Sequence, residues 1–119
     1  MKLVFFTITG QTRRFIAKLN MAEQALELTP STMVTLDEEF ILICPTYEDG
    51  VDHIDDFLDD HKAQLKGLIG IGNRNFGPDF CHLAKRYATT YQVPLLYTLE
   101  FNGTPDDVEY VKGILQHES

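Results

Sequence analysis

Three short segments of the sequence, residues 3–6, 40–44 and 67–71, contain only apolar residues and glycine. Apolar runs of this length between polar loops are typical of β-strands. Strands that do not alternate between apolar and polar residues are buried on both faces, which occurs in parallel sheets covered by helices on each side. These segments therefore predict an α/β fold.

Helical and strand patterns alternate along the rest of the chain. Helices are expected at residues 11–20, from 52 to about 61 or 65, from Pro78 to Tyr91, and from about 104 onward. Further strands are expected at 25–28 and 93–101, although residues 21–37 carry little other pattern. Five strands in this rhythm suit the flavodoxin-like three-layer sandwich, a five-stranded parallel sheet of order 2-1-3-4-5. At 119 residues we expect one domain, residues 1–119.

The charge and the lack of long apolar segments exclude two kinds of partner. The formal net charge is −8, which argues against nucleic acid as a ligand. No apolar run approaches the ~20 residues that a membrane span requires. The first strand follows Met1 without the pattern of a signal peptide, so we expect a cytoplasmic protein.

The cysteines and histidines predict neither a metal site nor a catalytic nucleophile. Cys44 and Cys81 are the only cysteines, and in a cytosolic domain they are expected to be reduced core residues. The four histidines lack metal-ligand spacing and are expected at the surface: His53, His61, His82 and His117. Residues 37–60 hold many carboxylates and no lysine or arginine, and those at 55, 56, 59 and 60 are expected to form a solvated helix face.

The turn after the first strand has the composition of a phosphate-binding loop. Residues 7–12 combine three threonines with Gly10 directly before the first helix. Backbone N–H groups and the helix dipole favour an anion at such a point. The turn lacks the Gly-Lys-Ser/Thr of a Walker loop. A plain strand-to-helix turn with a threonine cap is the alternative.

Two further unusual loops are predicted at the same edge of the sheet. Residues 45–50 and 72–77 follow the strands at 40–44 and 67–71, and parallel strands end at one edge. One aromatic residue stands in each loop, Tyr47 and Phe76. A phosphate cradle, flat apolar surfaces and polar backbone groups are what flavin mononucleotide (FMN) requires, so FMN is the predicted ligand. The alternatives are that Tyr47 is a core residue and that Phe76 packs under its own loop.

Other proteins that use this kind of sheet fit the sequence less well. A phospho-receiver domain needs acids where the chain has Thr7 and Cys44-Pro45. A small tyrosine phosphatase needs a Cys-x5-Arg loop, and neither Cys44 nor Cys81 has arginine at that offset. A dinucleotide fold needs Gly-x-Gly-x-x-Gly, which is absent.

The motifs resemble those of the NrdI family over nearly the whole chain. They are Thr-Ile-Thr-Gly-Gln-Thr-Arg-Arg-Phe at 7–15, Pro-Thr-Tyr at 45–47, Gly-Asn-Arg-Asn-Phe-Gly-x-x-Phe-Cys at 72–81, Val-Pro-Leu-Leu-Tyr-x-x-Glu at 93–100 and Gly-Thr-Pro-Asp-Asp-Val at 103–108. The 72–81 motif is the most specific of these. Gln11 stands where Asn is common in the family, and the loop at 45–50 is short and acidic.

The resemblance implies an accessory flavoprotein of class Ib ribonucleotide reductase rather than an independent enzyme. Reduced FMN would pass electrons to dioxygen, and the superoxide-type oxidant would assemble the dimanganese-tyrosyl radical cofactor of the reductase small subunit. The flavin carries the chemistry, so no catalytic residue is expected. The partners implied are that small subunit and an unidentified flavin reductant. A general electron-transfer flavodoxin and a flavin-free protein-binding module are the alternative functions.

The same resemblance places the cofactor on three groups of residues. The phosphate would be held by Thr7, Ile8, Thr9, Gly10, Gln11 and Thr12. The ribityl chain and ring would meet Thr46, Tyr47, Glu48, Asp49 and Gly50. The pyrimidine edge would meet Asn73, Arg74, Asn75, Phe76 and Gly77. Glu48 and Asp49 are expected to disfavour negative charge on the reduced ring.

Overall fold

The structure is a computed structural model that describes residues 2–6, 10–20, 25–29, 35–45, 52–72, 81–101 and 103–117. Only the backbone is described at positions 11 and 117. In chain order the elements are β1 (Lys2–Phe5), α1 (Gln11–Lys18), β2 (Ala25–Glu27), β3 (Phe40–Cys44), α2 (Asp52–Asp60), β4 (Leu65–Gly72), α3 (His82–Tyr91), β5 (Leu95–Glu100) and α4 (Pro105–His117).

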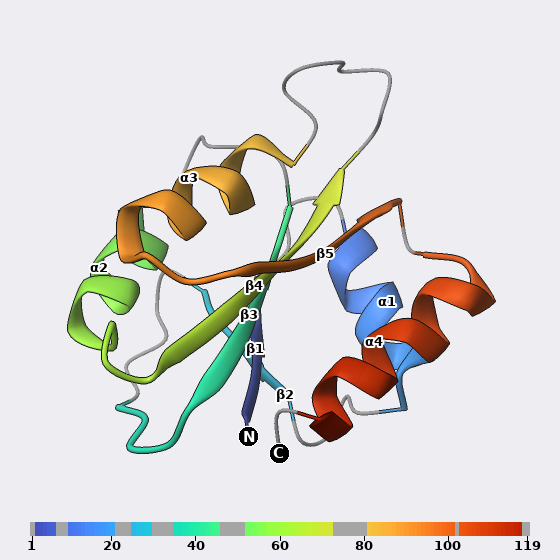
Figure 1. The fold of residues 1–119 in the computed structure, drawn as a ribbon, viewed down its shortest axis with the longest axis horizontal. Helices are drawn as coiled ribbons and strands as arrows, with labels where there is room; N and C mark the ends of the chain where they lie inside the picture. The colour runs from blue at the N-terminus through green and yellow to red at the C-terminus, as the bar shows by residue number, and fades with distance from the viewer. Residues whose placement is uncertain are drawn as a thin grey trace.

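The five strands form one parallel sheet in the order β2-β1-β3-β4-β5 (Figure 1). The predicted flavodoxin-like order is confirmed. After β1 the chain moves to one side of the sheet to form β2, and β3 then pairs with the other side of β1. The carboxyl ends of β1 and β3 are therefore the switch point of the sheet, where ligands bind in folds of this kind.

Helices α2 and α3 cover one face of the sheet and helices α1 and α4 cover the other (Figure 1), and an apolar cluster fills the space between sheet and helices on each face. On one face, Ile54 and Leu58 of α2 and Leu83 of α3 pack against the strands. On the other face, Phe15 of α1 and Val111 of α4 do so. Every residue of β3 is buried, because this strand lies in the middle of the sheet with helices above and below it.

Three element boundaries differ from the predicted ones for identifiable reasons. Helix α1 ends at Lys18 rather than at Asn20, because Asn20 has a φ of 62° and Asn tolerates this left-handed conformation. Strand β4 begins at Leu65, where exposed Lys66 forms an ion pair with Glu39. Helix α3 begins at His82, because Cys81 has a φ of 55°, which is not helical; the predicted start at Pro78 lies outside the described residues.

His61 is buried, so the prediction of a surface residue was wrong. Its side chain is 5% exposed. The Leu36 N–H donates to Nε2 at 3.0 Å, and Nδ1 lies 2.8 Å from the Phe57 carbonyl oxygen. The imidazole also stacks on the Phe57 ring with centroids 4.0 Å apart. His61 therefore connects the segment before β3 to the end of α2.

Two carboxylates of α2 bond to tyrosines of α3 instead of only facing solvent. The Tyr87 hydroxyl donates to Asp55 Oδ1 at 2.7 Å, and the Tyr91 hydroxyl donates to Asp59 Oδ1 at 2.7 Å. The pKa values of both tyrosines are raised, first by burial and then by these bonds. The solvated face that we predicted is thus in part an interhelical contact.

Candidate functional site

The structure brings the starting points of the three predicted loops to one edge of the sheet. The loops begin after Phe6, Pro45 and Gly72, and the strands that lead to them are parallel neighbours. Helix α1 also begins at this edge, directly after Gly10. The edge therefore combines the carboxyl ends of the three strands with a helix N-terminus.

The N-terminus of α1 is arranged to receive an anion. Gly10 is the N-cap residue, with a φ of 89° that favours glycine, and among the described residues no side chain caps the helix. The first turn contains no acidic residue. Because the first N–H groups of a helix lack partners within it, an anion at this position gains both hydrogen bonds and the positive end of the dipole.

A buried hydroxyl without a partner points to the same ligand. Thr12 lies in the first turn of α1 and is 1% exposed. Its Oγ1 is the one buried side-chain polar atom of the described residues that has no hydrogen-bond partner. Leaving such a group unpaired costs about 1–3 kcal/mol, so native structures pair it unless it serves a ligand or water. A phosphate oxygen at the helix N-terminus would accept a hydrogen bond from it, and the residues present therefore fit an anionic cofactor group.

Arg13, the basic residue that follows Thr12, forms an ion pair with Glu27. Arg13 Nη2 lies 2.6 Å from Glu27 Oε2, which connects α1 to the edge strand β2. The pair is exposed and contributes little to stability. An anion at the N-terminus of α1 would therefore be held by N–H groups and hydroxyls rather than by this arginine.

Most of the predicted site residues lie outside the described part of the chain. Gly10 and Thr12 are described, and so is the backbone of Gln11. The remaining thirteen are not: Thr7, Ile8, Thr9, Thr46, Tyr47, Glu48, Asp49, Gly50, Asn73, Arg74, Asn75, Phe76 and Gly77. Their roles stay predictions.

One close contact beside the third loop was missed in the sequence. A Cβ placed on Gly70 of β4 would lie 2.9 Å from Cys81 Cβ, 3.0 Å from Cys81 Sγ and 3.0 Å from Ala84 Cβ. Glycine is therefore required for α3 to lie this close to the strand. A glycine inside a buried strand is the signal that could have shown it, because such glycines often mark a close approach.

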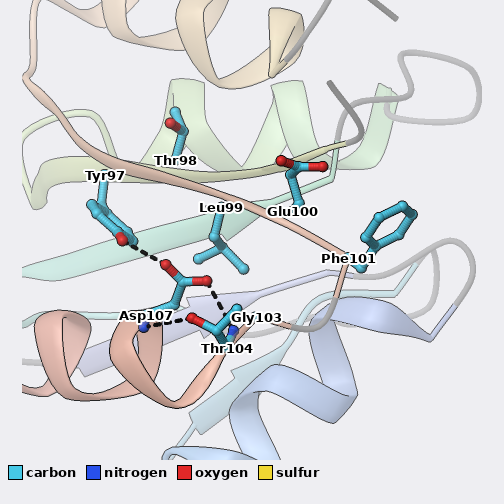
Figure 2. A pocket seen from close by; sticks show the side chains of 8 residues that line it. All are labelled: Tyr97, Thr98, Leu99, Glu100, Phe101, Gly103, Thr104 and Asp107. Carbon is cyan, nitrogen blue, oxygen red and sulfur yellow. Dashed lines mark hydrogen bonds between the residues drawn. The ribbon is translucent and has the colours of Figure 1, made fainter. Parts of the chain in front are cut away.

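A hollow of about 420 Å³ lies beside β5, and two of the polar residues that line it, Tyr97 and Asp107, bond to each other (Figure 2). The Tyr97 hydroxyl donates to Asp107 Oδ1 at 2.5 Å. The Thr104 N–H donates to Asp107 Oδ2 at 2.9 Å, and the Asp107 N–H donates to Thr104 Oγ1 at 3.2 Å. This reciprocal pair is a capping box for α4.

Metal binding and membrane insertion find no support in the described residues. No group of three or more His, Cys, Asp or Glu side chains there could hold a metal ion. None of the described helices has the length and apolar character needed to cross a membrane. Cys44 and Cys81 are both free thiols and both buried, as predicted.

Comparison with known proteins assigns the family. The model of the family described as "NrdI Flavodoxin like" matches residues 3–113. The chain belongs to the NrdI family. Among curated relatives, Protein NrdI of Cronobacter sakazakii is 37% identical over 123 residues, covering 95% of this chain and 92% of the relative. Protein NrdI of Mycoplasma genitalium is 35% identical over 121 residues, covering 93% and 79%.

Solved structures support the flavodoxin-like fold of this NrdI family member. A short-chain flavodoxin associated with a bacterial microcompartment superposes with a TM-score of 0.66 at 17% identity, covering 99% of this chain and 97% of that one. Two-electron reduced Megasphaera elsdenii flavodoxin gives a TM-score of 0.51 at 18% identity. The fold and the family together imply a flavin cofactor.

Proposed function

We propose that this protein binds FMN and acts as a redox accessory protein of class Ib ribonucleotide reductase. The observation that carries the proposal is the buried, unpartnered Thr12 hydroxyl at the uncapped N-terminus of α1. That position is where the phosphate of a flavodoxin-like cofactor would lie, at the switch point of the sheet. Membership of the NrdI family supports the reductase as the partner.

The residues of the three loops have separate roles in this proposal. Residues 7–12 would hold the phosphate through N–H groups and hydroxyls, residues 46–50 the ribityl chain and one side of the ring, and residues 73–77 the pyrimidine edge. The flavin, when bound and reduced, supplies electrons to dioxygen and so yields the superoxide-type oxidant that the dimanganese small subunit uses. The chain itself binds and orients the cofactor and supplies no general acid or base.

Charged residues of the second and third loops would tune the potential of the flavin. The carboxylates of Glu48 and Asp49 would disfavour negative charge on the ring, because like charges repel. Replacing them together (E48Q and D49N) should raise the two-electron midpoint potential. Arg74 is the only cation between Lys66 and Lys85, and it would balance charge on the reduced ring or contact the partner. If the variant with both E48Q and D49N has the same midpoint potential as the wild type, these two carboxylates do not tune the flavin.

The decisive test of function uses the manganese-loaded small subunit. The flavin-loaded protein is reduced, mixed with that subunit and exposed to air, and the tyrosyl radical is measured by electron paramagnetic resonance. The proposal expects a radical signal that is absent when the flavin is omitted. Absence of the signal with a yellow, FMN-containing protein would favour a general electron-transfer flavodoxin. A colourless protein that takes up no FMN would leave the flavin-free binding module.

A further inference from the structure

The turn between β5 and α4 lies against α1, the helix at whose N-terminus the phosphate is proposed to bind. Helices α1 and α4 lie on the same face of the sheet (Figure 1). In the turn, the Gly103 N–H donates to the Glu100 carbonyl oxygen at 3.0 Å, and Gly103 has a φ of 80°. This left-handed backbone conformation is one that glycine adopts without strain.

Gly103 also lacks space for a side chain, because a ring of α1 occupies that space. A Cβ at Gly103 would lie 2.7 Å from Phe15 Cδ1 and 2.9 Å from Phe15 Cε1. The Phe15 ring is completely buried in the apolar cluster between α1, α4 and the sheet. Because buried side chains are closely packed, the ring cannot simply turn aside. A side chain at position 103 would therefore push α1 and the turn apart.

A second contact joins the same turn to the last residue of α1. The Lys18 ammonium group donates to the Gly103 carbonyl oxygen at 3.0 Å. Phe15 and Lys18 are three residues apart, so they lie on the same side of the helix. Packing at Phe15 and a charge-assisted hydrogen bond at Lys18 therefore hold α1 against Gly103.

The position of α1 matters for phosphate binding because the helix carries the groups that would bind the anion. Thr12, whose buried hydroxyl has no partner, lies about one turn before Phe15 in the same helix. Hydrogen bonds to oxygen require donor–acceptor distances of about 2.7–3.2 Å. A small displacement of α1 would therefore weaken the bonds of its N–H groups and of the Thr12 hydroxyl together.

We infer that Gly103 and Lys18 position α1 for phosphate binding and thereby help to set the preference of the site for FMN over riboflavin. This inference rests on the proposed function, because it concerns the phosphate of the cofactor. Both are positioning residues, since they act through the helix. Lys18 lies six residues after Thr12, about 9 Å along the helix axis, and its ammonium group bonds to the turn.

The test compares the affinity of each variant for FMN and for riboflavin, which lacks the phosphate, by quenching of flavin fluorescence. Gly103→Ala should weaken FMN binding about tenfold and Lys18→Met about threefold, while riboflavin affinity stays within about twofold of the wild type. Lys18→Arg keeps a cationic donor and should bind FMN within about twofold of the wild type. A variant that is only less stable would lose affinity for both ligands alike.

The chain offers a matched control for each substitution. At Gly113 in α4, a Cβ would meet nothing within 4 Å, so Gly113→Ala should leave both affinities unchanged. Lys62 is exposed and follows α2, which packs on the other face of the sheet. Lys62→Met removes the same charge as Lys18→Met and should also leave both affinities unchanged.

The pattern of the two affinities decides the inference. If the wild type prefers FMN and neither Gly103→Ala nor Lys18→Met reduces that preference, the inference is rejected while the proposed function stands. Equal losses of FMN and riboflavin affinity, or an effect of Lys62→Met as large as that of Lys18→Met, also reject it. A wild type that binds FMN no more tightly than riboflavin rejects the proposed phosphate site and the inference with it. Should Gly103→Ala fail to fold, Lys18→Met and Lys18→Arg still decide.

Discussion

Tyr97 on the edge strand β5 donates its hydroxyl hydrogen to Asp107 in the first turn of α4, and the two oxygens lie 2.5 Å apart (Figure 2). Asp107 also closes the capping box of that helix with Thr104. The Tyr97 ring stacks on exposed Tyr110 of α4 at a centroid distance of 4.4 Å. One carboxylate therefore connects the last strand to the start of the last helix.

The Tyr97 bond predicts how stability changes at alkaline pH. The bond to Asp107, and secondarily burial, raises the pKa of Tyr97 to about 12, above the ~10 of an unfolded tyrosine. Its contribution is therefore fully present below pH ~10 and is lost as pH rises through about 12. Tyr97→Phe should lower the free energy of unfolding by about 1 kcal/mol or less at pH 8, and the difference from wild type should shrink toward pH 12. Urea unfolding across this pH range measures it.

Tyr110→Phe provides the control for that experiment. It preserves the stacked ring and removes a hydroxyl from a residue that is 56% exposed. Its free energy of unfolding at pH 8 should match that of the wild type. If Tyr97→Phe lowers the free energy of unfolding by the same amount at every pH, the substitution removes packing rather than the bond to Asp107.

The two cysteines should be unreactive in the folded protein. Burial, and then the nearby Cys81, raises the pKa of the Cys44 thiol well above its usual range. The thiolate is the reactive form, so the native protein should react with a thiol reagent such as Ellman's reagent far more slowly than the unfolded protein. Two thiols should react at once in guanidinium chloride. Rapid modification of either cysteine in the native state would contradict the burial of that side chain.

Replacement of His61 should be among the more damaging single changes. His61→Ala leaves the Leu36 N–H without its acceptor and removes the ring stacked on Phe57. We expect a loss of about 2 kcal/mol or more. Lys62→Gln at an exposed position should change stability by about 0.5 kcal/mol or less. Chemical unfolding measures the loss of stability in both variants. Equal losses would mean that the hydrogen bonds of His61 contribute nothing to stability.

The sequence predicted the elements of the fold well because its strands leave little ambiguity. Residues 40–44 are apolar throughout, and the structure forms β3 over that same segment. Alternation of strands and helices then allowed few orders of the sheet. The ends of elements were harder, since they depend on single backbone angles such as those of Asn20 and Cys81. Local periodicity carries no information about such angles.

Long-range side-chain contacts could not be predicted in this way. The partner of His61 is the N–H of Leu36, 25 residues earlier in the chain. Asp55 and its partner Tyr87 are 32 residues apart. A histidine or aspartate near a helix surface looks the same in sequence whether or not a distant group meets it. The turn between β1 and α1 was easier to recognise, because strand, glycine and helix follow one another directly; its role in phosphate binding stays a prediction.

The central claim is that the N-terminus of α1 binds the phosphate of FMN through Thr12, and Thr12→Val tests it most directly. The substitution keeps the shape of the side chain and removes only the unpartnered hydroxyl. Affinities for FMN and for riboflavin, which has no phosphate, are measured by quenching of flavin fluorescence, and stability is measured without flavin. We predict that the wild type binds FMN more tightly than riboflavin, and that Thr12→Val weakens FMN binding about tenfold or more. Riboflavin binding should not change, and the flavin-free variant should be at least as stable as wild type. Equal binding of FMN and riboflavin by the wild type, or unchanged FMN affinity in Thr12→Val, would contradict the claim.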